Sequence, residues 1–398
     1  MAAKIEMPSS RESQVRTVPF HKPSIGEDEI SAVVDTLRSG WLTMGPKTRE
    51  FEEAFAAEIG APHAIAVNSC TAALHLALDA LELQPDDEVI TSTLTFTASA
   101  ATVIHAGARP VLADVTEGTL NLDPQDVERK ITPRTRAIVP VHYAGHPVEM
   151  DEIVAIARRH GLAIVEDAAH AVPSSYKGRK IGTLGEITAF SFYTTKNITT
   201  GEGGMLTTAD EELATRMRVR RLHGMSKDAW KRYTAQGSWR YDIAYPGFKY
   251  NTTDVNAALG LVQLGRMHAL RNARARIARR YDELLAGIEG LTLPTTLPHV
   301  DHAWHLYVVR IDPEKSAHSR DDVIEKMKEA GIGTSVHFIP LHQHSYYRDT
   351  FGYRPEDFPV ASRAADRILS LPLYPDMQPT DVEYVAETLA RFVRRPSR

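Results

Sequence analysis

Four short stretches of the sequence carry residues that could do chemistry, and each follows a run of apolar residues. Ser191 and Lys196 lie in GEITAFSFYTTKNITTGEGG, where hydroxyl and glycine residues surround the lysine. Asp167 and His170 lie in LAIVEDAAHA. An amine held at a depressed pKa can attack a carbonyl to form a Schiff base, so Lys196 is a candidate nucleophile.

The other two stretches could bind an anion and a flat ring. AVNSCTAALHLALDAL predicts a strand, a turn and a helix, and the backbone N–H groups near Thr71 and Ala72 could hold a phosphate. Phe96, in TSTLTFTASA, could stack on a ring. With Asp167 to keep a pyridine nitrogen protonated, the four stretches supply the parts of a site for pyridoxal 5′-phosphate (PLP).

Each of these residues also has an ordinary explanation when it is taken alone. Lys196 could be a surface lysine, and Asp167 and Thr71 could cap helices. His170 and Phe96 could pack in the core. The case for a site depends on all four stretches following strands.

Seven short β-rich runs, alternating with helical stretches, would position these residues. The runs show too little polar alternation for a sheet with one face in water, which favours a mostly parallel sheet covered by helices. Ligands of such α/β folds collect beyond the carboxyl ends of the strands. The expected strands are 63–67, 87–92, 108–115, 135–142, 162–167, 187–192 and 204–208.

A smaller α+β domain is expected after the helical stretch 270–288, since β-like runs (HLYVVRID, GTSVHF) alternate there with helical ones. We interpret the arginines of that helical stretch as a solvated face. The expected organisation is a lead-in over 1–30, a large domain over 31–270 and a small domain over 271–398.

The composition restricts the class of protein. With 43% hydrophobic and 24% charged residues, the 398-residue chain is ordinary for a globular protein, and no apolar run is long enough for a membrane span. The net charge of -5 gives no general attraction to nucleic acid. A single cysteine, Cys70, and the lack of a secretory signal favour a reducing compartment, and the cytoplasm is the expected location.

A histidine-rich segment, VHFIPLHQH, raises the question of a metal site. His337, His342 and His344 are close in sequence, but no carboxylate or thiol accompanies them there. Zinc sites with imidazole ligands commonly include such partners, so we expect no metal.

Along the chain, the candidate phosphate site comes first, then the stacking ring, then the partner of the pyridine nitrogen, and then the lysine. This order resembles that of fold-type I PLP enzymes, whose fold is like that of aspartate aminotransferase. Longer motifs narrow the resemblance to the DegT/DnrJ/EryC1/StrS family of PLP-dependent nucleotide-sugar aminotransferases, from about residue 20 to residue 378. These motifs are SGWLTMGPKTREFE, EDAAHAV, SFYTTKNITTGEGG, GFKYNTTDVNAALG, HAWHLYVVR, VHFIPLHQ and LSLPLYPDM.

The resemblance implies a role for each candidate residue. Lys196 looks like the lysine that binds the cofactor and moves protons, Asp167 like the partner of the pyridine nitrogen, and His170 like the contact to the 3′-oxygen. Phe96 looks like the stacking aromatic. The other implied contacts are Ser191, Thr71 and Ala72 to the phosphate, and His337 and Phe338 to the substrate.

One segment departs from the common family pattern. Many members have Asn-Tyr-Arg where this chain has Lys249-Tyr250-Asn251, and in the family the neighbouring subunit brings this segment to the phosphate. With a lysine at this position, the segment is similar to that of the subgroup of enzymes that makes UDP-4-amino-4-deoxy-L-arabinose. The resemblance therefore implies a homodimer with shared active sites, in which Lys249 or Asn251 reaches the phosphate.

The activity implied by the resemblance is transfer of an amino group from L-glutamate, giving 2-oxoglutarate, to a nucleotide-linked keto-sugar. C4 of a UDP-linked sugar is preferred, in the synthesis of lipopolysaccharide or another cell-surface polysaccharide. Sugar 3-dehydratases of the family have a histidine in place of Lys196, which argues against that alternative. Cys70, in the phosphate turn, does not suit a desulfurase, and nothing basic supports a nucleic-acid-binding regulator.

Overall fold

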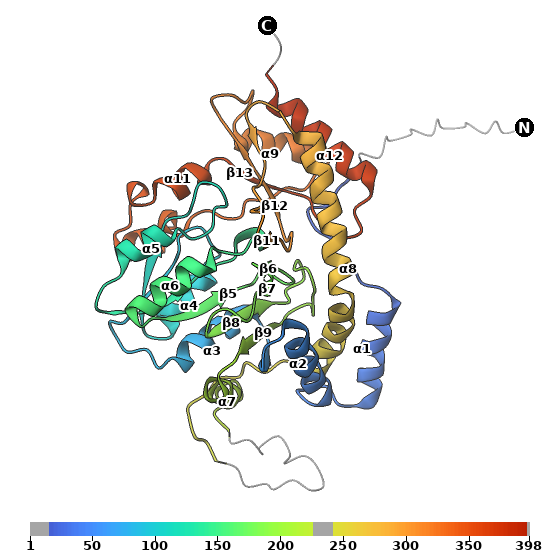
Figure 1. Cartoon of the computed structure of the whole chain (residues 1–398). Helices are drawn as coiled ribbons and strands as arrows, with labels where there is room; N and C mark the ends of the chain where they lie inside the picture. The colour runs from blue at the N-terminus through green and yellow to red at the C-terminus, as the bar shows by residue number, and fades with distance from the viewer. Residues whose placement is uncertain (1–15, 226–241, 396–398) are drawn as a thin grey trace, which may run out of the picture.

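The computed structural model describes residues 16–225 and 242–395, and a seven-stranded sheet forms its centre (Figure 1). The strand order is β1-β9-β8-β5-β4-β2-β3, and β9 alone runs antiparallel to its neighbours. The predicted mostly parallel sheet is confirmed. Its strands are β1 (His63–Val67), β2 (Glu88–Ser92), β3 (Arg109–Ala113), β4 (Thr135–Val139), β5 (Ala163–Asp167), β8 (Ile187–Ser191) and β9 (Gly204–Thr208).

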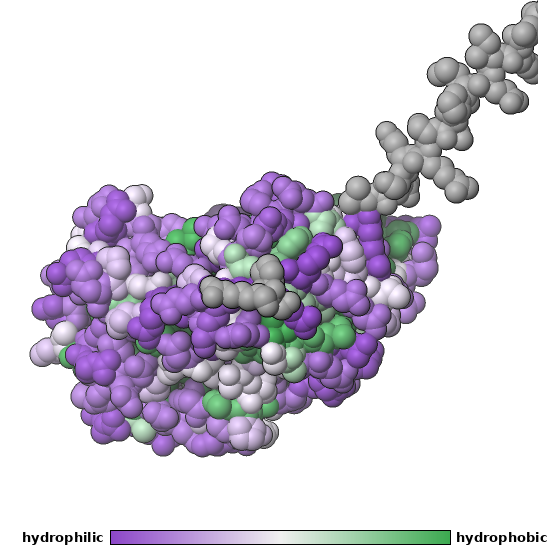
Figure 2. Space-filling model, turned by 90° about the horizontal axis from the view of Figure 1, so that it is seen from above, coloured by the Kyte–Doolittle hydropathy of each residue, from purple (hydrophilic) through white to green (hydrophobic). Residues whose placement is uncertain are grey.

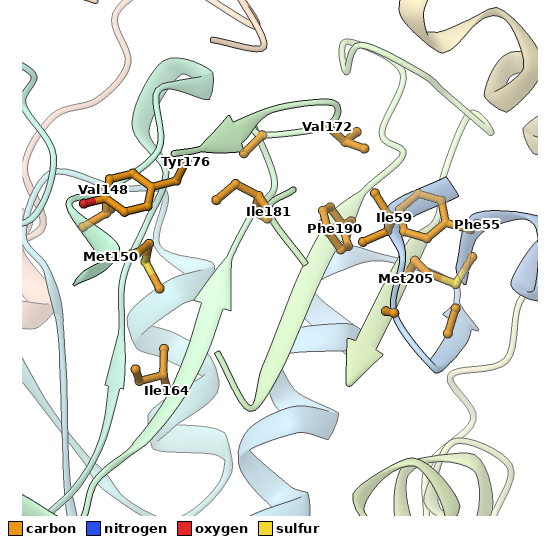
Figure 3. Close-up of a cluster of buried hydrophobic side chains, with 14 of the residues drawn as sticks. Phe55, Ile59, Val148, Met150, Ile164, Val172, Tyr176, Ile181, Phe190 and Met205 are labelled. Atoms are coloured by element: carbon orange, nitrogen blue, oxygen red, sulfur yellow. The ribbon is translucent and has the colours of Figure 1, made fainter. Parts of the chain in front are cut away.

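Helices cover both faces of this sheet, and alternate residues of each strand face opposite layers. In β1, Ile65 and Val67 belong to a buried cluster with helices α3 (Cys70–Ala80), α4 (Ala98–His105) and α7 (Glu211–Arg220). Ala64 and Ala66 belong to the cluster formed with helices α2 (Pro46–Ile59), α5 (Pro124–Lys130), α6 (Met150–His160) and α8 (Asp254–Leu285). Figure 3 shows part of this second cluster. Because both faces are buried, the strands lack the polar alternation of a half-exposed sheet.

Most helices of the large sheet follow its strands, as expected for an α/β fold, whereas α1 and α2 precede β1. The strand expected over 135–142 ends at Val139, because Pro140 has no N–H for the ladder. These helices are α1 (Glu27–Ser39), α2 (Pro46–Ile59), α3 (Cys70–Ala80), α4 (Ala98–His105), α5 (Pro124–Lys130), α6 (Met150–His160) and α7 (Glu211–Arg220), with the short helix η1 (Tyr143–Gly145).

The C-terminal part is a smaller α+β unit, as predicted. Helix α8 (Asp254–Leu285) is 32 residues long and runs from the side of the large sheet to the C-terminal helices α9 and α12 (Figure 1). It therefore crosses residue 270, where the large domain is expected to end. The other elements are β10 (Leu291–Thr292), β12 (Tyr307–Ile311), β13 (Ile368–Leu371), α9 (Arg320–Glu329), α10 (Ser345–Phe351), α11 (Pro359–Ala365), α12 (Pro379–Val393), η3 (Leu341–Gln343) and η4 (Pro355–Asp357).

A small sheet joins the large domain to the C-terminal part of the chain. Its strand order is β11-β6-β7, and both pairings are antiparallel. It thereby ties residues after α8 to the large domain. Its strands are β6 (Ser175–Tyr176), β7 (Arg179–Lys180) and β11 (Val300–Asp301).

Two expectations for the C-terminal part are wrong. The run GTSVHF forms no continuous strand, because Ile332 bridges Val18 whereas Ser335 bridges Ser370, so the pairing partner changes within three residues. The arginines of α8 are not all solvated. Arg274 is 1% exposed and donates hydrogen bonds to the carbonyl oxygens of His305 and Leu373 at 3.3 and 2.8 Å.

The face seen in Figure 2 is mostly hydrophilic, with hydrophobic residues gathered in a few patches. Within 16–225 and 242–395, no helix combines the length and apolar character needed to cross a membrane. Residues 1–15 of the expected lead-in lie outside the described residues.

Candidate functional site

A cavity of about 430 Å³ lies where β5 and β8 end, and it gathers most of the candidate residues. Asp167 is the last residue of β5 and Ser191 the last residue of β8, so both emerge at the same edge of the sheet. Helix α3 begins at this cavity with Cys70 and Thr71. The candidates that line it are Thr71, Phe96, Asp167, His170, Ser191, Lys196, His337 and Phe338.

Lys196 lies in a turn after β8, and its side chain is partly exposed in the cavity. The turn is fixed by a hydrogen bond of 2.9 Å from the Lys196 N–H to the Tyr193 carbonyl oxygen. Burial lowers the pKa of the amine from 10.5 to about 8, against the opposing effects of Cys70 and Asp167. A substantial fraction of the amine is therefore neutral near pH 8, as attack on a carbonyl requires.

Asp167 is 5% exposed, and neighbours fix both of its carboxylate oxygens. The Ser99 hydroxyl donates to Oδ2 at 2.7 Å, and the Ala169 N–H donates to Oδ1 at 3.1 Å. No helix begins here, because the residues after Asp167 form turns. The helix-cap explanation is therefore wrong, and a fixed, desolvated carboxylate faces the cavity.

The ring of His170 also lines the cavity and packs against His305, with 4.4 Å between the ring centroids. Nδ1 of each ring is buried without a hydrogen-bond partner among the described residues. Burial, helped by the nearby Lys196, lowers the pKa of both histidines well below 6.5. Both imidazoles are therefore neutral, and the protein leaves hydrogen-bonding capacity at the cavity unused.

His305 is a residue that we did not single out from the sequence, although it belongs to the HAWH motif. The Ala144 carbonyl oxygen accepts the His305 N–H at 3.1 Å. Gly145, which follows Ala144, has φ +96, and a Cβ on it would lie 2.8 Å from the His170 carbonyl oxygen. Glycine therefore allows the turn at 144–145 to hold the two histidines together.

The start of α3 forms a cradle at the cavity. The Ser69 hydroxyl caps the helix by accepting the Ala72 N–H at 3.1 Å. A Cβ on Gly204, at the start of β9, would lie 2.5 Å from the Ser69 carbonyl oxygen and 2.8 Å from the Cys70 nitrogen. The last glycine of the GEGG motif therefore lets β9 pass close behind the turn. Ala72 itself does not line the cavity, so its phosphate contact stays a prediction.

Aromatic rings form another wall of the cavity. Phe96 is 60% exposed, so it is not a core residue, and its ring centroid lies 6.1 Å from that of Phe338. His337 Nδ1 is 2.9 Å from the Ser370 hydroxyl, and burial lowers its pKa to about 4. Both ring nitrogens of His342 form hydrogen bonds, one with the Thr93 hydroxyl and the other with the Ser362 hydroxyl.

Lys249 and Asn251 lie outside the cavity of their own chain. Lys249 is exposed, and its Nζ donates to Asn251 Oδ1 at 2.6 Å. Asn251 bridges Val67 at the end of β1. Among the described residues that line the cavity, Lys196 is the only lysine or arginine. Apart from Lys196, the cavity of a single chain thus has no lysine or arginine in this part of the structure.

The fold and these residues match a known family. The model of the DegT/DnrJ/EryC1/StrS aminotransferase family matches residues 23–390. The chain belongs to the DegT/DnrJ/EryC1/StrS aminotransferase family. It is accordingly a sugar aminotransferase that uses PLP, on the fold-type I scaffold expected from the motifs.

Individual relatives resemble this aminotransferase over almost their whole length. The spore coat polysaccharide biosynthesis protein SpsC of Bacillus subtilis is 54% identical over 95% of this chain and 97% of its own. Spr1654 of Streptococcus pneumoniae, solved in PLP and PMP forms, is 35% identical with a TM-score of 0.88, covering 95% and 98%. The sugar aminotransferase CalS13 of Micromonospora echinospora is 32% identical with a TM-score of 0.85, covering 94% and 100%.

The residues of the cavity fit PLP. A neutral amine suits its aldehyde, a fixed carboxylate suits its ring nitrogen, and an exposed phenyl ring suits its face. The unpartnered imidazole of His170 can bond a ring oxygen, and the cradle closed by Gly204 offers helix N–H groups to a phosphate.

Proposed function

We propose that this enzyme transfers the amino group of L-glutamate to C4 of a keto-sugar linked to UDP. The observation that carries the proposal is the Lys196 amine, with its pKa lowered to about 8, in the same cavity as the buried Asp167 carboxylate. The sugar position and the nucleotide rest on the GFKYN motif, which resembles that of enzymes acting on UDP-linked 4-keto-pentose. The relative SpsC supports a product used in a surface polysaccharide.

The bound cofactor would supply an electron sink that stabilises negative charge at the carbon carrying the amino group. Lys196 Nζ would hold it and, once free, would accept the proton from Cα of the amino donor. Asp167 would keep a proton on the ring nitrogen. Phe96 would stack on the ring and His170 would bond a ring oxygen, while Ser191 and the cradle at Thr71 would bind the phosphate.

The second half of the reaction uses the same groups in reverse. Lys196 Nζ would return a proton to the sugar carbon, and the ketone would become an amine by taking the amino group that glutamate gave up when it became 2-oxoglutarate in the first half. We propose that His337 and Phe338, which line the cavity, contact the sugar. A neutral His337 can donate a hydrogen bond to a sugar hydroxyl without adding charge.

A substrate panel tests the proposed acceptor. The purified enzyme, PLP and L-glutamate are incubated with 4-keto and 3-keto sugars linked to UDP or dTDP, and the products are read by mass. We expect conversion of ketone to amine for a UDP-linked 4-keto-sugar, with an equal amount of 2-oxoglutarate. Amination of only 3-keto or only dTDP-linked sugars would reject the proposed position or nucleotide, and loss of water instead would indicate a dehydratase.

We also propose that the working unit is a homodimer with shared active sites. Within one chain, the cavity-lining residues that the structure describes offer the phosphate no cation apart from Lys196 itself. Lys249 is exposed and outside the cavity, so it is available to a second copy. A two-fold axis would give two equivalent sites at one interface.

Subunit mixing tests this arrangement. Lys196→Ala and the double variant Lys249→Ala/Asn251→Ala are each expected to be inactive or strongly impaired as pure proteins. Under subunit exchange, the heterodimer contains one site with both Lys196 and an intact 249–251 segment, so part of the activity should return. Mixing Lys196→Ala with itself is the control. No recovery despite exchange proven by mass, or a monomer in light scattering, would place the phosphate site within one chain.

A further inference from the structure

The segment from Phe248 to Asn251 is fastened to helix α3 by one buried contact that has no part in the chemistry described above. The Tyr250 hydroxyl and His75 Nδ1 share a hydrogen bond of 2.8 Å. His75 is 8% exposed and lies on the first turns of α3, close to the residues that line the cavity. Burial lowers the pKa of His75, which keeps the ring neutral and able to make this bond.

Rings on both sides hold this contact in place. Phe248 and Tyr250 are stacked with 4.9 Å between centroids and an angle of 13°. The His75 ring lies 4.8 Å from Phe248. The three rings therefore form one cluster that joins the helix to the segment, and the hydroxyl-to-imidazole bond fixes their relative positions.

The backbone of the same segment is bonded to the turn before the helix. The Tyr250 carbonyl oxygen accepts the Asn68 N–H at 2.8 Å, and the Lys249 carbonyl oxygen accepts from Asn68 Nδ2 at 3.3 Å. Asn68 directly precedes Ser69, the cap of α3. A displacement of Tyr250 would therefore move both the turn of this chain's own cradle and the two residues proposed to reach the phosphate in the site of the second copy.

We propose that Tyr250 is a positioning residue for the phosphate of the cofactor. It acts by fastening the 249–251 segment to the helix whose start forms the cradle. The inference rests on the proposed function, in that Lys249 or Asn251 binds the phosphate. It adds a residue that touches neither cofactor nor substrate but that controls how tightly the phosphate end of the cofactor is bound.

Comparison of PLP with pyridoxal, which lacks the phosphate, tests the inference. Tyr250→Phe keeps the stacked ring and removes the hydroxyl. We expect the Kd of the apo-enzyme for PLP to rise about tenfold, the size of effect given by one lost hydrogen bond with a buried partner left unpaired. The Kd for pyridoxal should not change. His75→Leu removes the bond from the other side and should give the same selective loss.

A matched control lies just before this segment and bonds to the same helix. The Tyr245 hydroxyl donates to Asp79 Oδ1 at 3.1 Å, near the end of α3 that is remote from the cradle. Tyr245→Phe should leave the Kd for PLP unchanged, while its effect on the Tm of the apo-enzyme is comparable. Equal weakening of PLP and pyridoxal by Tyr250→Phe, or an unchanged Kd for PLP, would overturn the inference. Failure of the wild-type enzyme to bind PLP or to transfer an amine would instead reject the proposed function.

Discussion

Lys196→Ala enzyme is expected to bind PLP and to show no measurable amino transfer. The substitution removes the amine whose pKa burial lowers to about 8, and with it the base that moves the substrate proton. Binding should persist, because the cradle at α3, the Asp167 carboxylate and the Phe96 ring remain. Absorbance titration of the apo-protein measures binding, and release of 2-oxoglutarate from glutamate measures turnover.

Two further variants complete this test: Lys196→Arg asks whether the positive charge alone is enough, and Lys177→Ala is a surface control. Lys196→Arg keeps a cation, but a guanidinium does not become neutral in this pH range, so it should be as inactive as the alanine variant. Lys177→Ala removes a surface lysine paired with Asp151 and should keep wild-type turnover. Adding methylamine to Lys196→Ala should restore a small part of the proton transfer by supplying a base.

Covalent labelling gives an independent check of the same residue. Borohydride reduction of the wild-type enzyme with PLP should fix the cofactor to the tryptic peptide that contains Lys196. Label on another lysine, or wild-type turnover in Lys196→Ala, would show that the amine of Lys196 is not the group that binds the cofactor.

The sequence predicted the part of the site that local pattern controls. Asp167 and Ser191 each end a run of apolar residues, and a buried parallel sheet brings such ends to one edge. The start of α3 was predictable for the same reason, because a strand, a small turn and a helix cap are all local signals. These three features lie side by side at one edge of the large sheet and line part of the cavity.

Features that depend on distant contacts were not predictable from local pattern. His305 reaches the cavity because the turn at Gly145, 160 residues earlier in the chain, binds its backbone. Arg274 lies in a helix rich in exposed arginines, yet it is buried because two carbonyl oxygens from other parts of the chain accept its hydrogen bonds. In both cases the decisive partner is far away in sequence, so neither spacing nor periodicity could show it.

Asp167→Asn enzyme is expected to fold, to bind PLP and to lose most of the rate of proton transfer. Asparagine has nearly the same shape, and its carbonyl oxygen can still accept the Ala169 N–H that now binds Oδ1. A neutral amide does not stabilise a protonated ring nitrogen. Loss of an electrostatic partner in a dry site costs about 3–4 kcal/mol, which corresponds to a rate lower by roughly a hundred- to a thousandfold.

Stopped-flow absorbance of the cofactor after addition of glutamate measures this half of the reaction directly. Ser99→Ala is the matched control, because it removes the 2.7 Å hydrogen bond to Oδ2 and leaves the charge of Asp167 in place. Its rate should fall far less than that of Asp167→Asn, since one hydrogen bond contributes about 1 kcal/mol. If Asp167→Asn kept the wild-type rate, or if both variants lost the same amount, the negative charge would not be the property that matters. A large loss confined to Asp167→Asn would assign the effect to the charge that this carboxylate holds at the end of β5.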